Sequence, residues 1–312
     1  MKIIIFGGAG FIGKNLVRAF AEKKYDIVVY DRIDVPFSAD RVRYVQGNLS
    51  DVDTMADIIS QGDIVVHLAW NGVPADQLAD AAQNIISDLI PTVRLFSACV
   101  KKHAKKIIFM SSGGAVYGKP QDIPMSEAHP LEPLSDYGIN KLACEKYLKT
   151  LTAGTETQGI VLRLANPYGP FQRPFGKQGV VATFLASALL DKEICVWGDG
   201  SAVRDYIYID DVVKAVCAAV NYSGSETVFN VASGEGNSVA EIIQTIERIT
   251  GKTLNKTYKS AYVAEVGRNI LDCTRISSEF GWSATTTLEK GIRAMLDCWN
   301  PQENQFNALR WE

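Results

Sequence analysis

The chain has 312 residues, of which 47% are hydrophobic and 21% are charged, and its mean hydropathy is +0.01. At about 150 residues per domain, this length predicts two folding units with a substantial core, and it excludes a disordered chain or a staple-dependent miniprotein. The net charge of −3 lacks the basic excess that binds nucleic acid or an anionic membrane surface, so neither is an expected partner.

The apolar runs are shorter than the ~20 residues that a membrane span needs. Glycines follow the first apolar residues too soon for a signal peptide, so we expect a cytosolic protein. The six cysteines show no C-x-x-C spacing and the three histidines are scattered. We therefore expect reduced thiols, with neither a disulfide framework nor a metal site.

The first half of the chain alternates short apolar runs with helix-length segments. A helical pattern follows the first run through Leu16 and Phe20, and a long helical segment covers 79–102, where Pro91 is expected to kink or divide the helix. Such apolar runs joined by helices indicate the α/β class, with a Rossmann doubly wound parallel sheet covered on both faces. The predicted strands are 3–6, 27–30, 42–45, 64–68, 106–110 and 160–164.

After Asn166 the pattern loosens into Pro-Tyr-Gly-Pro and Arg-Pro-Phe-Gly, which is loop-forming sequence. We expect residues 1–165 to form one unit and 166–312 a smaller mixed α/β unit, with parts of the chain crossing back between them. The cleft between the two is the default binding site. In the second unit we predict helices at 179–190 and 209–220, a strand at 194–197 and terminal helices ending near Trp299.

A glycine-rich turn, Gly-Gly-Ala-Gly-Phe-Ile-Gly at 7–13, lies between the first predicted strand and helix. Gly10 lets a pyrophosphate reach the N–H groups at the helix start, and Gly13 lets helix and strand pack closely. A tight turn without a ligand has the same glycines. The next strand ends at Asp31, whose carboxylate can accept both hydroxyls of an adenosine ribose and would repel a 2′-phosphate, a preference that the adjacent Arg32 softens. Together these features favour NAD over NADP, with contacts expected from Gly7, Gly10, Phe11, Ile12, Gly13, Asp31 and Arg32.

Tyr137 and Lys141 lie one helical turn apart on a predicted helix that runs to about Thr150. A nearby ammonium stabilises a phenolate, so Lys141 and a bound cationic nicotinamide ring are expected to lower the pKa of Tyr137 from about 10 toward neutrality. The pair is suited to acid–base catalysis. A solvent-exposed pair on a helix surface has the same spacing.

Several motifs occur along nearly the whole chain in a characteristic order. The chain resembles the extended short-chain dehydrogenase/reductases, and within them the NAD-dependent epimerase/dehydratase group, similar to UDP-glucose (UDP-galactose) 4-epimerase. The motifs are Gly-Gly-Ala-Gly-Phe-Ile-Gly (7–13), Val-Val-His-Leu-Ala (65–69), Ser-Ser-Gly-Gly-Ala-Val-Tyr-Gly (111–118), Tyr-Gly-Ile-Asn-Lys (137–141), Arg-Leu-Ala-Asn-Pro-Tyr-Gly-Pro (163–170) and Trp-Gly-Asp-Gly-Ser-Ala-Val-Arg-Asp-Tyr-Ile-Tyr-Ile-Asp-Asp (197–211).

The resemblance implies that Tyr137 is the acid–base residue and that Lys141 is its cationic partner and a ligand of the nicotinamide ribose. It also implies a Ser or Thr hydroxyl that binds the sugar oxygen. Counted back from the 117–118 dipeptide, that position falls on Gly113, whereas counted back from Tyr137 it falls on Ser112. We assign it to Ser112; the alternative is that Ser111 and Ser112 only cap the strand end.

Further binding residues follow from the same resemblance. Leu68 and Ala69 are expected to line the NAD groove, and Asn48 stands where many relatives have an aspartate facing the adenine, with Leu49 beside it. Asn166 and Arg204 match positions that bind the nucleotide diphosphate, for which the guanidinium fork of Arg204 is suited. A second family arginine is replaced by Tyr262, and Arg268 is the candidate substitute.

The reaction implied is a 4-epimerisation of a nucleotide-diphosphate sugar. Tyr137 removes a hydroxyl proton as the C4 hydride passes to NAD, and the transient 4-ketose rotates and takes the hydride back on its other face. An NAD(P)H-dependent 4-ketoreductase of 4-keto-6-deoxy sugars would use the same residues. A 4,6-dehydratase is disfavoured because 113–115 contains no carboxylate, and a non-catalytic NAD-binding protein is the alternative outside enzymes. Relatives commonly pair through surface helices, and the apolar positions of 79–102 and 134–151 permit a similar homodimer. Packing within one chain would produce the same apolar pattern.

Overall fold

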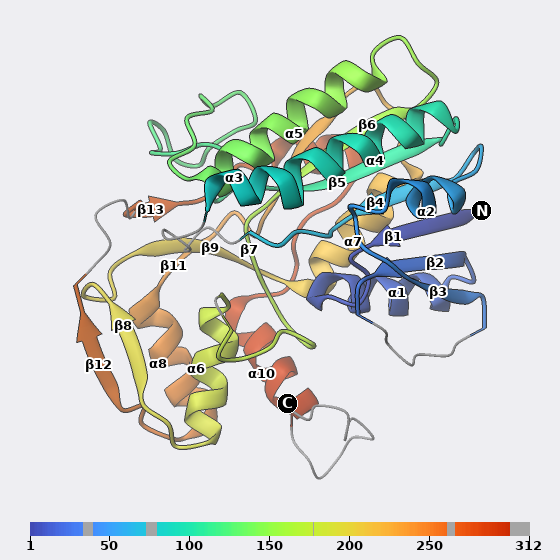
Figure 1. Cartoon of the computed structure of the whole chain (residues 1–312). Helices are drawn as coiled ribbons and strands as arrows, with labels where there is room; N and C mark the ends of the chain where they lie inside the picture. The colour runs from blue at the N-terminus through green and yellow to red at the C-terminus, as the bar shows by residue number, and fades with distance from the viewer. Residues whose placement is uncertain (34–39, 73–79, 177, 261–265, 300–312) are drawn as a thin grey trace.

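A parallel sheet with helices on both faces is the larger part of the computed structural model, which describes residues 1–33, 40–72, 80–176, 178–260 and 266–299 (Figure 1). Within these residues the strands are β1 (Lys2–Phe6), β2 (Asp26–Asp31), β3 (Val42–Gln46), β4 (Ile64–His67), β5 (Lys106–Ser112), β6 (Gln158–Leu164), β7 (Asn166–Tyr168), β8 (Ile194–Trp197), β9 (Val203–Tyr208), β10 (Val228–Val231), β11 (Gly236–Ser238), β12 (Lys256–Lys259) and β13 (Arg268–Asn269). The helices are α1 (Phe11–Glu22), α2 (Val52–Asp57), α3 (Ala81–Asn84), the π-helical η1 (Ile85–Leu89), α4 (Ile90–Lys101), α5 (Asp136–Thr152), α6 (Val180–Leu189), α7 (Ile209–Asn221), α8 (Val239–Thr250), α9 (Thr274–Phe280) and α10 (Leu288–Trp299).

The large sheet contains seven strands within the described residues, in the order β10-β6-β5-β4-β1-β2-β3. Every neighbouring pair in it is parallel. From β1 the chain moves outward to β3 on one side and then, from β4 onward, to the opposite edge, which is the doubly wound Rossmann topology. The fold class predicted from the sequence is therefore confirmed.

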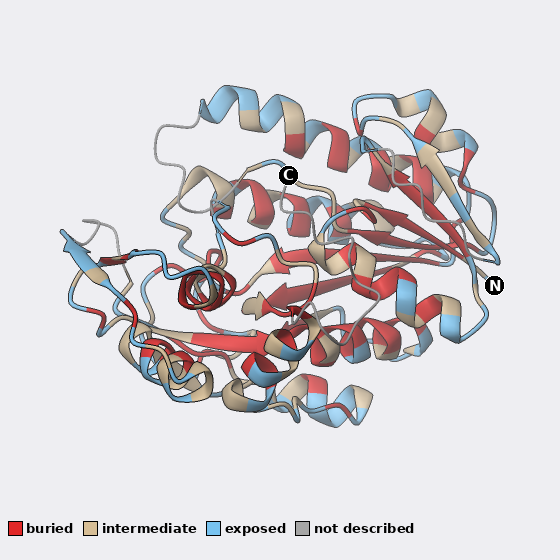
Figure 2. Ribbon diagram, turned by 90° about the horizontal axis from the view of Figure 1, so that it is seen from below, coloured by how far each residue is buried: buried red, intermediate tan, exposed pale blue. Residues whose placement is uncertain are grey.

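Side chains that alternate along the strands build two separate cores, one on each face of the sheet. Ile3 and Ile5 of β1 belong to the core that includes α1 and α7, whereas Ile4 and Phe6 belong to the core under α2, α4 and α5. Figure 2 shows the buried strands enclosed between helices. The inner strands are buried on both faces and are therefore nearly continuous apolar runs, which makes them recognisable in the sequence. The edge strand β3 has no buried residue, and its sequence Val-Arg-Tyr-Val-Gln mixes apolar and polar side chains.

The long helix predicted at 79–102 is divided into three pieces. Its described part begins at Ala81 and continues through α3, the π-helical turn η1 and α4. Pro91 is the second residue of α4 and follows directly on the π-helical turn. Leu89 and Ile90 keep helical backbone angles and the Ile90 N–H donates to the Ile85 carbonyl, so the helical path continues through the proline. The irregularity that the sequence predicted near Pro91 takes the form of this π-helical turn. The π-helical turn carries Asp88, which is only 1% exposed.

One strand of the large sheet, β10, has no counterpart among the predicted strands. It lies at 228–231 and pairs in parallel with β6, and α7 packs against α1 and β5. The chain after residue 166 therefore supplies one edge of the large sheet. The division into units at 1–165 and 166–312 stays a prediction.

The remaining elements form a smaller mixed layer beside the carboxyl ends of the large sheet. There β9 pairs with β7, β11 and β13, and β8 pairs with β12. Helices α6, α8 and α10 pack against one another next to these strands (Figure 1). The predicted helices at 179–190 and 209–220, the strand at 194–197 and a last helix ending at Trp299 are all present. No helix in the described part of the chain is long and apolar enough to cross a membrane.

Candidate active site

The glycine turn between β1 and α1 has room for a pyrophosphate. Gly7 has a φ of +84°, a left-handed conformation that favours glycine. A Cβ at Gly13 would lie 2.5 Å from the Gly7 oxygen, so glycine is needed for α1 to approach β1. At Gly10 a Cβ would meet only the Gly7 oxygen, at 3.3 Å. The space in front of Gly10 is open, and α1 begins there without a side-chain cap, which leaves its first N–H groups suited to an anion.

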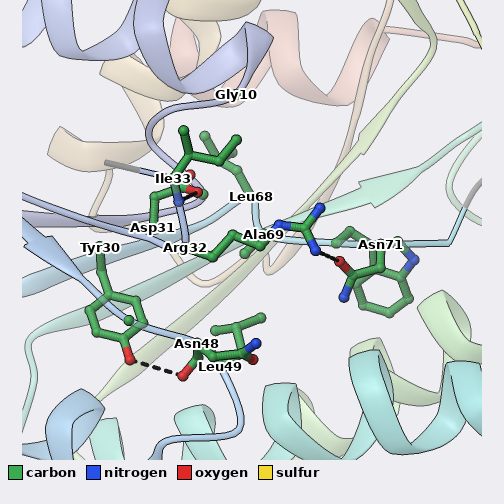
Figure 3. Close-up of a pocket in the computed structure, with 13 residues that line it drawn as sticks. Gly10, Tyr30, Asp31, Arg32, Ile33, Asn48, Leu49, Leu68, Ala69 and Asn71 are labelled. Carbon is green, nitrogen blue, oxygen red and sulfur yellow. Dashed lines mark hydrogen bonds between the residues drawn. The ribbon is translucent and has the colours of Figure 1, made fainter. Parts of the chain in front are cut away.

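A groove of about 200 Å³ runs from this turn along the ends of β2, β3 and β4 (Figure 3). The structure brings most of the predicted cofactor-binding residues to this groove. They are Gly7, Gly10, Asp31, Arg32, Asn48, Leu49, Leu68 and Ala69. The others line an adjoining larger cavity and are Phe11, Ile12, Gly13, Tyr137 and Lys141.

Asp31 ends β2 at the position that the sequence predicts. One carboxylate oxygen accepts a hydrogen bond from the Ala9 N–H at 2.9 Å, and the other accepts one from the Ile33 N–H at 3.1 Å. A carboxylate offers about four lone-pair sites, so both oxygens can still accept from ribose hydroxyls. Beside it, Arg32 donates from Nη1 to the side-chain oxygen of Asn71 at 3.0 Å (Figure 3).

Asn48 and Leu49 form the wall of the groove beyond β2. The Tyr30 hydroxyl donates to the Asn48 carbonyl at 2.9 Å (Figure 3), and Oδ1 of Asn48 accepts from the Ser50 N–H at 3.1 Å. These two bonds fix both the backbone and the side chain of Asn48. The position is therefore ordered before any ligand arrives.

The larger cavity, of about 590 Å³, lies between the two layers and continues from the groove. Gly7, Gly10, Leu68 and Trp70 line both spaces. Its walls include residues of β5 and α5 from the large sheet and of β7, α6 and β9 from the small layer. It contains the predicted residues Ser112, Tyr137, Lys141 and Asn166.

Ser112, and not its neighbour, reaches the tyrosine. The Ser112 hydroxyl is close enough to that of Tyr137 to favour its phenolate, whereas the Ser111 hydroxyl is buried and donates to Glu145 at 2.5 Å. A Cβ at Gly113 would lie 2.3 Å from Cδ1 of the buried Leu271, so a side chain there would have to displace that leucine. The geometry thus supports the register counted back from Tyr137.

Lys141 lies close to Tyr137 but is not directed at its hydroxyl. The ammonium donates to the Met110 carbonyl at 2.8 Å and lies 5.8 Å from the centre of the Tyr137 ring. Burial raises the pKa of Tyr137 to about 12, and the negative charge of Asp88 adds to the rise while the Ser112 hydrogen bond opposes it. In the chain alone, the desolvation of the phenol outweighs its favourable contacts. The lowering expected with a bound nicotinamide ring stays a prediction.

Burial also acts on the lysine. It lowers the pKa of Lys141 to about 8, although the charges of Asp88 and Glu145 favour the ammonium. Glu145 itself forms a buried ion pair with Arg163 at 2.7 Å. This pair joins α5 to β6, so the helix that carries Tyr137 and Lys141 is fixed to the sheet.

Two further residues at the site were not recognised in the sequence. Trp70 follows β4 by three residues and packs on Lys141, and Asp88 binds the backbone of the turn after Trp70. The available signal for Trp70 was its place just past a central parallel strand, where ligands bind in such sheets. No sequence signal pointed to Asp88, because a single acidic residue on a helix is ordinarily exposed to solvent.

The residues expected to bind a diphosphate are only partly brought to the cavity. Asn166 lines it and donates from Nδ2 to the Asp205 carbonyl at 2.9 Å. Arg204 is half-buried on β9 and is not one of the described residues that line the cavity, although it lies on the same face of the strand as Tyr206, which does. Arg268 is exposed on β13, and Tyr262 lies outside the described residues.

A doubly wound sheet with a glycine turn, an acid ending β2 and a cavity at the carboxyl ends of the strands defines a dinucleotide-binding α/β protein. Residues 3–232 match the model of the NAD dependent epimerase/dehydratase family. The chain belongs to this family, and its cofactor is NAD.

Relatives of known name are similar over nearly the whole chain. A dTDP-4-dehydro-6-deoxyglucose reductase from Escherichia coli is 34% identical, over 94% of this chain and 96% of the relative. The crystal structure of a Thermotoga maritima UDP-glucose 4-epimerase with UDP-glucose is 33% identical, with a TM-score of 0.89 over 95% of this chain and 98% of that one. A Bacillus cereus UDP-glucuronic acid 4-epimerase, solved with UDP-glucuronic acid and NAD, is 28% identical, with a TM-score of 0.85 and the same coverage.

Proposed function

We propose that the protein is an NAD-dependent 4-epimerase of nucleotide-diphosphate sugars. The observation that carries the proposal is the grouping of Ser112, Tyr137 and Lys141 in one cavity that opens directly onto the dinucleotide groove. The similarity to two solved UDP-sugar 4-epimerases supports this choice of substrate class.

Each residue then has one task. Bound NAD supplies the acceptance and return of a hydride. Tyr137 takes the proton from the C4 hydroxyl and returns it, and Ser112, whose hydroxyl favours the Tyr137 phenolate, binds the same sugar oxygen and orients it. Lys141 binds the nicotinamide ribose and provides positive charge beside the phenol.

The raised pKa of Tyr137 makes its base form dependent on the bound cofactor. A phenol with a pKa of about 12 is protonated at neutral pH, and a cationic nicotinamide ring nearby would stabilise the phenolate. Tyr137 would therefore lose its own proton, and become able to take that of the sugar hydroxyl, only when the oxidised cofactor is bound. After taking the proton, Tyr137 would hold it beside the sugar oxygen, in position to return it to the same atom.

The nucleotide diphosphate is assigned to the part of the cavity nearest the small layer. Asn166 lies on its wall, and Arg204 supplies the guanidinium fork from the central strand β9, with Arg268 on the neighbouring strand β13 as a further cation. In this assignment the sugar would lie between the diphosphate and Tyr137.

A 4-ketoreductase is the second candidate function. It is favoured by the 34% identity to a reductase that acts on a dTDP-linked 4-dehydro-6-deoxy sugar. Arg32 at the rim of the groove could accept the 2′-phosphate of NADPH. A dehydratase lacks support because the segment after Ser112 reads Gly113-Gly114-Ala115 and carries no carboxylate.

A cytosolic homodimer is the assembly we propose. Apolar side chains are exposed on the outer surface of η1 and α5, where Ile86 is 58%, Ile139 55% and Tyr147 48% exposed. Helices α4 and α5 pack side by side there (Figure 1). Pairing of this surface with its copy in a second chain would bury these side chains.

The proposal is tested with the Tyr137→Phe variant. Loss of the acid–base group should lower turnover of UDP-glucose by roughly 10²–10⁴-fold, measured by NMR without added cofactor, while NAD binding measured by calorimetry is retained. Tyr258→Phe, at an exposed tyrosine of β12, is the control and should behave as the wild type. Normal turnover by Tyr137→Phe would contradict the catalytic assignment.

A further inference from the structure

Trp70 lies between the cofactor groove and the sugar cavity and lines both. The Lys141 ammonium lies 3.8 Å from the centre of its ring, within cation–π range. The same indole packs edge-on against Tyr137, with ring centres 6.1 Å apart. Trp70 therefore touches both members of the acid–base pair.

The turn that carries Trp70 is fixed by Asp88. The buried carboxylate accepts from the backbone N–H and the side-chain Nδ2 of Asn71, each at 2.9 Å, and from the Gly72 N–H at 3.0 Å. Three bonds to the two residues after Trp70 restrict the path of the backbone there. Asp88 comes from the π-helical turn η1, a type of distortion that is frequent at functional sites.

We propose that Trp70 is a positioning residue, whose indole face holds the Lys141 ammonium beside Tyr137 and keeps it in its charged form. The inference rests on the proposed function, in which these two residues act as the acid–base pair. An ammonium has three N–H donors. One is used by the Met110 carbonyl and the indole face satisfies the charge on another side, so a donor direction remains for a bound ribose or sugar hydroxyl.

The electrostatic surroundings explain why this contact matters. Lys141 is 4% exposed, and its burial lowers its pKa to about 8. The groups that interact with its charge, besides Trp70, are Asp88 on η1, Glu145 and Cys144 on α5, His67 on β4, the Tyr137 ring and the Phe109 ring on β5, whose centre lies 4.8 Å from the ammonium. Removing the indole face leaves a buried cation with less compensation, so the ammonium should lose its proton at a lower pH.

The experiment compares Trp70→Leu and Trp70→Phe with the wild type. In Trp70→Leu, the basic limb of the rate–pH profile should move down by about 0.5–1 pH unit, the shift that a cation–π contact produces. Trp70→Phe keeps a weaker aromatic face and should shift it less. Trp197→Leu is the matched control, because this exposed tryptophan of β8 has Lys259 5.4 Å from its ring centre and lies outside the cavity.

A readout independent of turnover is the pH dependence of Lys141 acetylation by acetic anhydride, followed by mass spectrometry. It should show the same shifts. If Trp70→Leu does not fold, fluorinated tryptophans incorporated at position 70 keep the shape while weakening the cation–π contact, and the pKa of Lys141 should fall with each added fluorine. The inference would be overturned if the basic limb of the rate–pH profile and the pH dependence of Lys141 acetylation were both unchanged in these variants.

The two proposals fail in different ways. Inactivity of Tyr137→Phe together with an unshifted Trp70→Leu would leave the proposed function standing and reject the role of Trp70. Normal turnover by Tyr137→Phe would reject the acid–base assignment, whatever the acetylation profiles show.

Discussion

The two ends of the site are built in different ways. At the cofactor end, the decisive features are backbone features: the left-handed Gly7, the close approach at Gly13 and the strand end at Asp31. At the sugar end, side chains from β5, α5, β7 and α6 meet in one cavity. A site made from a continuous stretch of backbone depends on local sequence, whereas a site made from converging side chains depends on how distant elements pack.

The largest effect is expected at the cofactor end, with Gly13→Ala. The new Cβ would lie 2.5 Å from the Gly7 oxygen and from the Gly8 Cα, so α1 must move away from β1 and its N–H groups leave the pyrophosphate. The loss of two charge-assisted hydrogen bonds corresponds to roughly 10³-fold weaker NAD binding, measurable by calorimetry. Gly267→Ala, where a Cβ meets no atom within 4 Å, should bind NAD as the wild type does, and near-normal affinity of Gly13→Ala would contradict the assignment of the turn.

At the sugar end, Ser112→Ala should lower kcat by roughly 10²-fold, the contribution of one positioned catalytic group. NAD affinity should stay unchanged because the Ser112 hydroxyl is assigned to the sugar oxygen and not to the cofactor. Ser111→Ala is the sharpest contrast, since its hydroxyl donates to the buried Glu145. In that variant the free energy of unfolding in urea should fall by about 1–3 kcal/mol, and kcat should be retained. A loss of kcat in Ser111→Ala with normal kcat in Ser112→Ala would show that Ser111 is the catalytic hydroxyl and Ser112 the structural one.

The smallest effect is expected for Arg204→Ala. Loss of one charge-assisted bond to a diphosphate should weaken UDP binding by roughly 10-fold, measured by calorimetry, with NAD affinity retained. Arg248→Ala, at an exposed cation of α8 that pairs with Glu289, is the control. Unchanged UDP affinity in Arg204→Ala would remove this arginine from the site and leave Arg268 as the candidate.

The same difference explains what the sequence could predict. The six strands of the first half, the glycine turn and Asp31 depend on local patterns and were all recognisable. β10 was missed because its four residues gain their place only by pairing with β6. The surroundings of the Tyr137 hydroxyl could not be predicted from its spacing to Lys141. The ammonium is directed toward the Met110 carbonyl and burial raises the pKa of the phenol in the chain alone, and both follow from tertiary packing. Trp70 and Asp88 were not predicted either, because tertiary packing brings them to the site.

The central claim is that the protein oxidises a nucleotide sugar at C4 and reduces it again with the same hydride. It is tested most directly by incubating the purified protein, without added cofactor, with UDP-glucose and UDP-glucuronic acid that carry deuterium at C4, and by following the products by NMR. The account predicts a C4-inverted product that retains the deuterium at C4. Conversion of neither sugar, together with reduction of a 4-keto sugar nucleotide that begins only when NADPH is supplied, would contradict it and establish the reductase.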